Sequence, residues 1–219
     1  MKQIVDGIRD FQAGVFREQQ ELFEGLAAGQ HPEVLLITCS DSRIDPNLIT
    51  QTHPGELFVI RNAGNIVPPY SAGSGGEAAT IEYAVKALKV QNIVVCGHSH
   101  CGAMQGLLNP DGLASLPVVA SWLANATETA QVVRDQFADL TGAELLARTV
   151  AENVLVQLRN LQTHPSVADA LAKGTLKLHG WVYEFETGEV TAYDPVDEQF
   201  APITQLAAER LGMSLSNPA

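Results

Sequence analysis

The sequence predicts a single-domain α/β protein with a mostly parallel central β-sheet flanked by helices, an N-terminal helical arm and a C-terminal strand hairpin at the sheet edge. Short continuous apolar runs, typical of strands buried on both faces, occur at 33–38, 57–60 and 92–96. Helical spacing over 74–89 separates the last two runs, which gives a strand–helix–strand unit with parallel strands and a right-handed crossover. No repeat or Pro/Gly/Ser-rich linker divides the 219 residues.

The N-terminal segment has its own helical pattern. Apolar residues recur every three or four positions from Ile4 to Leu26, which predicts an amphipathic helix over about 2–28. Its apolar stripe must cover either its own sheet or a partner subunit. We therefore expect an arm over 1–30, an α/β domain over 31–210 and a C-terminal tail over 211–219.

The second half of the chain is predicted to be mainly helical before it returns to strands. Thr141 and Glu144 have the spacing of a capping box, ahead of a helix that His164-Pro165 ends. The runs 176–186 and 189–193 flank Thr187-Gly188 and predict the terminal hairpin.

Composition limits the partners and the compartment. Thirteen Lys and Arg against twenty-five Asp and Glu give a net charge of −12, which opposes binding to nucleic acid or an anionic membrane surface. Three cysteines are too few for the disulfide framework of a secreted domain. No apolar run resembles a signal peptide. We expect a cytoplasmic protein, or one enclosed in a compartment assembled from the cytosol.

Two loops that directly follow buried strands carry the reactive side chains. The first is Thr38–Arg43 and the second is Cys96–Gly102. Because the carboxyl ends of parallel strands share one edge, the two loops can meet where ligands bind open sheets. Two sulfurs and one imidazole nitrogen suit Zn²⁺ and leave a fourth position for water. Spacing alone does not decide which histidine of the second loop binds.

Other interpretations of these loops stay open at this point. Cys96 ends an apolar run and is expected to be a small apolar strand residue. Asp41 and Arg43 could form an ordinary solvated ion pair. A thiol-redox pair of Cys96 and Cys101 is disfavoured by the four residues between them, and a cysteine phosphatase is excluded because too few residues separate Cys39 from Arg43.

Three motifs in order resemble the β-class carbonic anhydrases, in particular the plant and cyanobacterial branch. They are Cys39-Ser-Asp-Ser-Arg43, Gly55-Glu-Leu-Phe-Val-Ile-Arg-Asn62 and Gly97-His-Ser-His-Cys-Gly102. The resemblance covers about residues 30–108 and extends more weakly to Gly180-Trp181. It implies that 31–210 is a zinc-binding catalytic domain.

Carried over position by position, the resemblance implies one Zn²⁺ per chain, held by Cys39, His98 and Cys101. Asp41 and Arg43 would form the catalytic dyad beside the fourth coordination position. The resemblance further implies substrate-binding roles, partly across a dimer interface, for Gln30, Phe58, Tyr83 and Gly102. The bicarbonate-inhibited bacterial branch has Trp where this sequence has Leu36, so we expect the open form in which Asp41 pairs with Arg43.

The implied activity is that of a lyase, reversible hydration of CO₂ to bicarbonate and a proton by attack of zinc-bound hydroxide on CO₂. The implied assembly is a homodimer or a higher homo-oligomer of dimers. The alternative on the same fold is a non-catalytic zinc-binding structural or scaffold protein of a CO₂-fixing, carboxysome-like compartment. Asp41 and Arg43 favour the enzyme, since a structural zinc site would not need them.

Overall fold

The computed structural model describes residues 1–206. Its strands are β1 (Val34–Cys39), β2 (Leu57–Asn62), β3 (Asn92–His98), β4 (Lys177–Tyr183), β5 (Val190–Asp194) and β6 (Gln199–Pro202). Its α-helices are α1 (Lys2–Ala13), α2 (Val15–Glu18), α3 (Gln20–Ala27), α4 (Pro46–Thr50), α5 (Gly76–Glu82), α6 (Gly102–Leu108), α7 (Pro117–Leu123), α8 (Thr127–Gln136), α9 (Gly142–Gln162) and α10 (Pro165–Ala172). Short 3₁₀ turns are η1 (Tyr70–Ala72), η3 (Pro110–Leu113) and η4 (Ala124–Ala126), and η2 (Tyr83–Leu88) is a π-helical continuation of α5.

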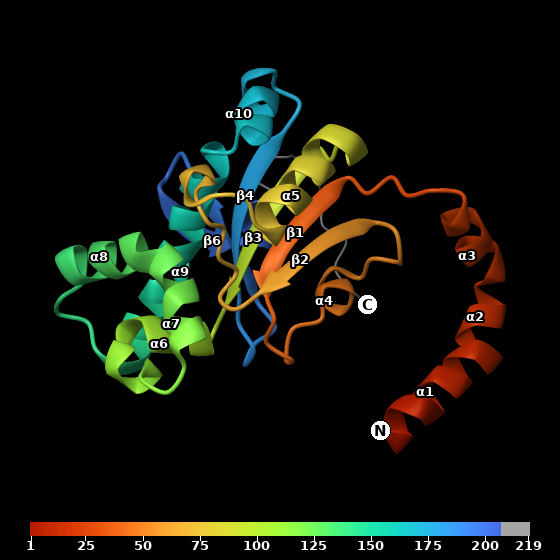
Figure 1. Ribbon diagram of the computed structural model, residues 1–219, viewed down its shortest axis with the longest axis horizontal. Helices are drawn as coiled ribbons and strands as arrows, with labels where there is room; N and C mark the ends of the chain where they lie inside the picture. The colour runs from red at the N-terminus through yellow and green to blue at the C-terminus, as the bar shows by residue number, and fades with distance from the viewer. Residues whose placement is uncertain (207–219) are drawn as a thin grey trace.

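The six strands form one sheet in the order β2-β1-β3-β4-β5-β6 (Figure 1). The first four strands are parallel, and β5 and β6 are antiparallel additions at one edge. The predicted fold class is therefore confirmed, including the terminal hairpin. The residue pattern does not predict the short strand β6, which extends the hairpin by one strand.

One face of the sheet is covered by α5, α9 and α10, which share the main hydrophobic core with β1 and β3. Close approach of α9 depends on glycines in the strands beneath it. A Cβ at Gly97 would lie 2.9 Å from Val150 Cγ1, and one at Gly180 would lie 2.8 Å from Val154 Cγ1. The opposite face carries a smaller apolar cluster that includes Leu36 and Cys96.

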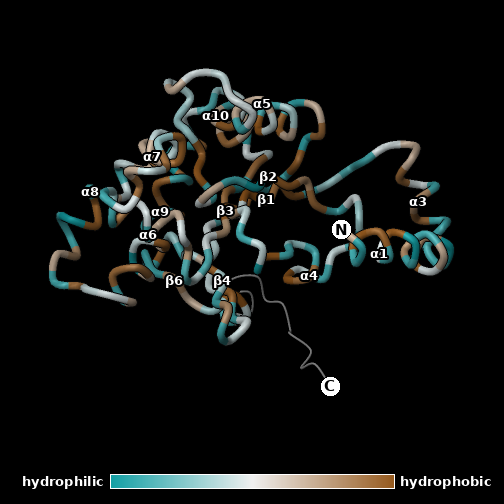
Figure 2. The backbone as a smooth tube through the Cα atoms, turned by 60° about the horizontal axis from the view of Figure 1, so that its bottom comes forward, coloured by the Kyte–Doolittle hydropathy of each residue, from teal (hydrophilic) through white to brown (hydrophobic). Residues whose placement is uncertain are grey.

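The N-terminal arm is separate from this core and extends from the body of the molecule (Figure 1). The single helix predicted over 2–28 is wrong in detail, because the arm is interrupted at Gly14 and Gln19 to give α1, α2 and α3. Apolar residues run along it (Figure 2), and Ile4 and Ile8 are 60% and 53% exposed. Among residues 1–206, no residue of α1 is buried, so its apolar stripe is open to solvent.

The predicted capping box of α9 is also wrong. Thr141 is the N-cap residue, but its side chain makes no capping hydrogen bond, and Gly142 follows in a left-handed conformation at φ +58°. The predicted tail over 211–219 lies outside the described residues. Among residues 1–206, no helix is long and apolar enough to span a membrane.

Candidate metal centre

Three candidate metal ligands meet at the carboxyl edge of the parallel strands. Cys39 is the last residue of β1, His98 is the last residue of β3, and Cys101 is the N-cap of α6. Their ligand atoms all lie within 4.8 Å of one another. The side chains are closed off from solvent, with exposed fractions of 6%, 0% and 1%. Parallel strand register thus brings residues 39 and 98 together, as the loop pattern predicts.

His98 has one ring nitrogen engaged and one free. Its Nδ1 lies 2.8 Å from the Ser99 carbonyl oxygen, to which an Nδ1–H donates. Nε2 is buried and has no hydrogen-bond partner among the described residues. Metal-binding histidines commonly donate their other ring N–H to a carbonyl in this way, which fixes the tautomer. A buried, unpartnered imidazole nitrogen beside two sulfurs is the arrangement that a bound metal ion would satisfy.

The two cysteines influence each other. The neighbouring Cys101 thiol lowers the pKa of Cys39; burial opposes this effect, and the nearby His98 and the Gly64 N–H, which donates to Cys39 Sγ, reinforce it. The same interaction with Cys39, together with burial, raises the pKa of Cys101. Cys39 is therefore the favoured thiolate of the pair, and a thiolate is the form that binds metal.

Asp41 and Arg43 form a two-point ion pair in the loop that follows Cys39. Arg43 Nε lies 2.9 Å from Asp41 Oδ1, and Nη2 lies 2.8 Å from Oδ2. The Arg43 side chain holds the pKa of Asp41 well below the ordinary range of a carboxyl group. The Asp41 carboxylate is not among the ligand atoms grouped within 4.8 Å. The carboxylate therefore faces Arg43 and stays ionised at neutral pH.

Residues that the motifs leave unassigned hold this pair in place. Arg61, on β2, donates from Nε to the Cys39 carbonyl at 3.0 Å and from Nη2 to the Asp41 carbonyl at 2.7 Å. The Phe185 ring lies 4.4 Å from the Arg43 guanidinium and 5.0 Å from the His98 ring. One signal could have placed both residues at this edge, because Arg61 is the penultimate residue of β2 and Phe185 follows the end of β4.

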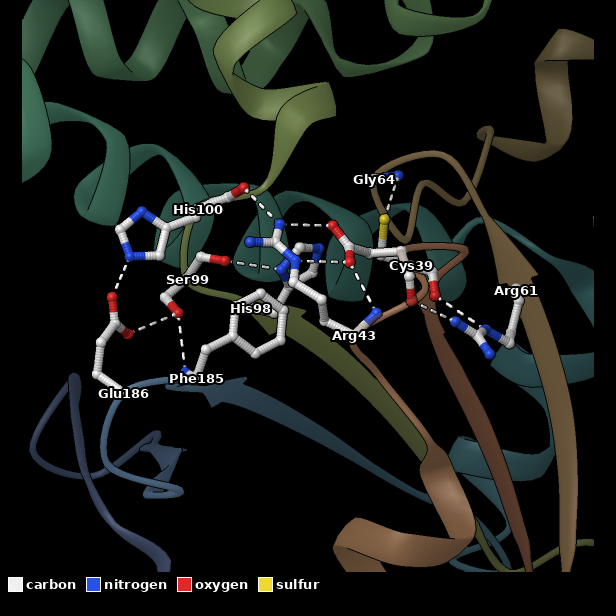
Figure 3. Close-up of polar contacts among 10 residues, drawn as sticks. Cys39, Arg43, Arg61, Gly64, His98, Ser99, His100, Phe185 and Glu186 are labelled. Atoms are coloured by element: carbon white, nitrogen blue, oxygen red, sulfur yellow. Dashed lines mark hydrogen bonds and ion pairs between the residues drawn. The ribbon is translucent and has the colours of Figure 1, made fainter.

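The second histidine of the loop has a different environment. His100 is half exposed and its Nε2 interacts with the Glu186 carboxylate, not with the cysteines (Figure 3). The structure therefore favours His98 over His100 in the choice that spacing left open. Cys96 is buried in β3, where burial raises the pKa of its thiol to about 12, so it behaves as the predicted apolar strand residue.

The expected substrate-binding residues do not all lie at this edge. Gly102 begins α6 directly after Cys101. Phe58 pairs with Leu35, four positions along β1 from Cys39, which is about 13 Å at ~3.3 Å per residue. Tyr83 lies against Phe58, with ring centroids 6.0 Å apart, and is 51% exposed. Gln30 is exposed between α3 and β1. Within one chain, Phe58 and Tyr83 are together but remote from Cys39.

The donor set fits Zn²⁺. Two sulfurs and one imidazole are borderline-soft ligands that zinc favours, and a three-residue set is typical of zinc sites with an open fourth position. Both thiols and the free Nε2 are buried, so water does not compete for them at the protein surface.

Comparison with known proteins agrees with this geometry. The sequence model of the carbonic anhydrase family matches residues 34–190. A carbonic anhydrase from Synechocystis sp. is 52% identical over 210 residues, covering 95% of this chain and 77% of the relative. One from Pseudomonas aeruginosa is 48% identical, covering 94% of this chain and 93% of the relative.

Solved structures show the same fold. The β-carbonic anhydrase CcaA superposes with a TM-score of 0.91 at 52% identity, covering 92% of this chain and 91% of that chain. A structure described among two tetrameric β-carbonic anhydrases from Sordaria macrospora gives 0.79 at 32% identity, covering 87% and 95%. With the family match spanning most of the sheet and all three candidate ligands, the chain belongs to the carbonic anhydrase family, in its β class.

Proposed function

We propose that this chain catalyses the zinc-dependent, reversible hydration of CO₂ to bicarbonate and a proton. The observation that carries the proposal is the buried Cys39, His98 and Cys101 cluster, with its unpartnered Nε2, beside an ionised Asp41–Arg43 pair. Membership of the β class supports the same activity.

Cys39, His98 and Cys101 would hold the zinc ion. When bound, zinc supplies a hydroxide nucleophile at neutral pH by lowering the pKa of water. Asp41 accepts a hydrogen bond from the attacking group and thereby orients it, since the carboxylate stays charged beside Arg43. Arg43 keeps the carboxylate from acting as a ligand itself, and Arg61 fixes the backbone on which Asp41 sits. Gly102 lies at the rim, where substrate enters.

The apolar wall of the substrate site would come from a second copy of the chain. Phe58 pairs with Leu35, four positions along β1 from the Cys39 of its own chain, and the half-exposed Tyr83 packs against Phe58. Gln30 is exposed in the loop before β1. The uncovered stripe of α1 supports an arm that packs on a partner. The Sordaria macrospora relatives are described as tetrameric. We therefore propose a homodimer, or a higher homo-oligomer of dimers, with catalytic domains of 31–210.

A cytoplasmic location, including enclosure in a carboxysome-like compartment, is part of the proposal and rests on the cysteine content and charge. The competing function is a non-catalytic zinc protein or scaffold of a CO₂-fixing compartment. The Asp41–Arg43 pair favours the enzyme because a purely structural zinc site gains nothing from a carboxylate held just outside its ligands.

The test compares two cysteine variants by zinc analysis and stopped-flow CO₂ hydration. Wild-type protein should hold one zinc per chain and hydrate CO₂. Cys39→Ser should lose both, whereas Cys96→Ser, the matched control in β3, should keep both. Normal CO₂ hydration by Cys39→Ser would contradict the assignment, and zinc retention without CO₂ hydration in the wild type would favour the structural alternative.

A further inference from the structure

The turn that follows β2 is held by side chains from neighbouring helices. The Asn160 amide donates to the Val67 carbonyl at 2.9 Å, and the Asn153 amide donates to the Gly64 carbonyl at 3.0 Å. The Gln157 carbonyl oxygen accepts from the Val67 N–H at 2.9 Å. Three polar residues of α9 thus fix the path of this turn past the metal centre.

One peptide unit in this turn connects α7 to a metal ligand. The Trp122 indole N–H donates to the Ala63 carbonyl oxygen at 2.8 Å. The N–H of the same peptide unit, that of Gly64, donates to Cys39 Sγ at 3.3 Å (Figure 3). The two bonds lie at opposite ends of one peptide dipole, so they form a continuous chain from the indole to the sulfur.

Gly64 has little freedom to move away from this position. Its φ of +82° is a left-handed conformation that favours glycine, and a Cβ would lie 2.9 Å from the Ala103 Cβ. Since the Asn153 amide holds the Gly64 carbonyl, the orientation of the preceding peptide depends on what holds the Ala63 carbonyl. Trp122 supplies that contact.

We propose that Trp122 is a positioning residue for the metal centre: through the Ala63–Gly64 peptide it orients and polarises the N–H that donates to Cys39 Sγ. Hydrogen bonds in series strengthen one another, because each polarises the next. A hydrogen bond to a thiolate draws electron density from the sulfur, so the sulfur donates less to the metal. This inference rests on the proposed metal centre and adds to it a residue outside the family motifs described above.

The expected effect is on how strongly the Cys39 thiolate donates electron density to the metal. Partners of metal ligands commonly change affinity or activity by about 10- to 100-fold, and one acting through a peptide should lie at or below the lower end. Loss of the indole donor should weaken the N–H···S bond and make the Cys39 thiolate a stronger donor. A metal-bound water would then be less acidic.

The test uses Trp122→Phe, which removes the donor and keeps an aromatic ring. The matched control is Trp181→Phe, the same change at the other tryptophan of the chain, which packs with the cluster on the opposite face of the sheet. In the Co²⁺-substituted proteins, Trp122→Phe should move the thiolate-to-metal charge-transfer band to lower energy, and Trp181→Phe should not. In the zinc proteins, Trp122→Phe should shift the pH profile of CO₂ hydration to higher pH with one zinc still bound.

A second readout and a second variant guard against simple misfolding. The Gly64 amide proton should move upfield in the NMR spectrum of Trp122→Phe. If that variant does not fold, the isostere 3-benzothienylalanine at position 122 retains the bicyclic ring without the N–H. An unshifted charge-transfer band and Gly64 resonance in a folded, metal-loaded variant would overturn the role of Trp122 alone. Failure of the wild-type chain to bind Co²⁺ or Zn²⁺ would overturn the metal centre as well.

Discussion

The two ends of strand β1 differ in whether one chain alone supplies the neighbouring site. We call the carboxyl end, with its metal cluster, the complete end, and the amino end, with its exposed aromatic pair, the incomplete end. At its carboxyl end, Cys39 joins His98 and Cys101 in a buried cluster, and Arg61 and Gly64 of the same chain donate hydrogen bonds to Cys39. At its amino end, Phe58 and Tyr83 form an aromatic pair that is partly open to solvent, next to an arm with an uncovered apolar stripe. The difference indicates that one chain builds the metal site, whereas the proposed substrate wall requires a second copy.

The largest effect is expected from the histidine at the complete end. His98→Ala removes the buried nitrogen that has no other partner, so zinc should be lost. CO₂ hydration should fall by more than about 100-fold, because changing a residue that only supports a metal ligand already costs up to about 100-fold. His100→Ala, at the half-exposed neighbour, should keep zinc and activity. The opposite pattern in metal analysis and stopped-flow assays would exchange the roles of the two histidines.

The next largest effect separates metal binding from turnover. Asp41→Asn keeps the size of the side chain but removes the charge that Arg43 holds in place. Zinc content should stay at one per chain, while the turnover number should fall by about 10²-fold or more, the usual range for a group that handles a proton. Equal loss of zinc and turnover would instead make Asp41 a metal ligand.

A complementation experiment tests whether Phe58 and Tyr83, at the incomplete end, line the metal site of a second copy of the chain. The double variant Phe58→Ala/Tyr83→Ala should keep zinc but lose about tenfold in activity, since it removes apolar packing around a small neutral substrate. Coexpression with His98→Ala should restore part of the activity, because a mixed dimer contains one intact metal site facing one intact wall. No recovery in isolated mixed dimers would place the wall and the metal in the same chain.

The smallest effect concerns pH. Because Arg43 lowers the pKa of Asp41, the ion pair adds stability at and above the ordinary carboxyl range, and this contribution is lost only as pH falls below that range. The difference in Tm between wild type and Asp41→Asn should therefore be constant from about pH 5 to 9 and shrink in acid. A change in that difference near neutral pH would show that Asp41 titrates there.

Much of the complete end could be predicted from the sequence. Cys39 and His98 lie in the loops that directly follow two apolar runs, and the carboxyl ends of parallel strands share one edge. Strand ends could also have placed Arg61 and Phe185 near this edge, but their contacts, and the contact made by Trp122, could not be predicted because they depend on lateral packing. Arg61 lies on β2, Phe185 lies after β4 and Trp122 lies on α7. Hydrophobic periodicity does not encode which groups near the metal centre these side chains contact.

The arm and α9 show where local patterns mislead. The apolar spacing from Ile4 to Leu26 predicted one helix, but the structure breaks it at Gly14 and Gln19. Thr141 and Glu144 have capping-box spacing, yet the left-handed Gly142 changes the path of the first turn, and the side-chain capping bond is absent. Spacing identifies the type of element, whereas backbone conformation at single residues decides its ends.

The most direct test of the proposed metal centre is X-ray absorption at the zinc edge of the zinc-loaded protein. Cys39, Cys101 and His98 predict two sulfur ligands at about 2.3 Å and a nitrogen at ~2.0 Å, with one further light ligand. Cys39→Ser should lose the zinc or one sulfur, and Cys96→Ser should leave the spectrum unchanged. A shell without sulfur, or one that changes in Cys96→Ser, would contradict the assignment.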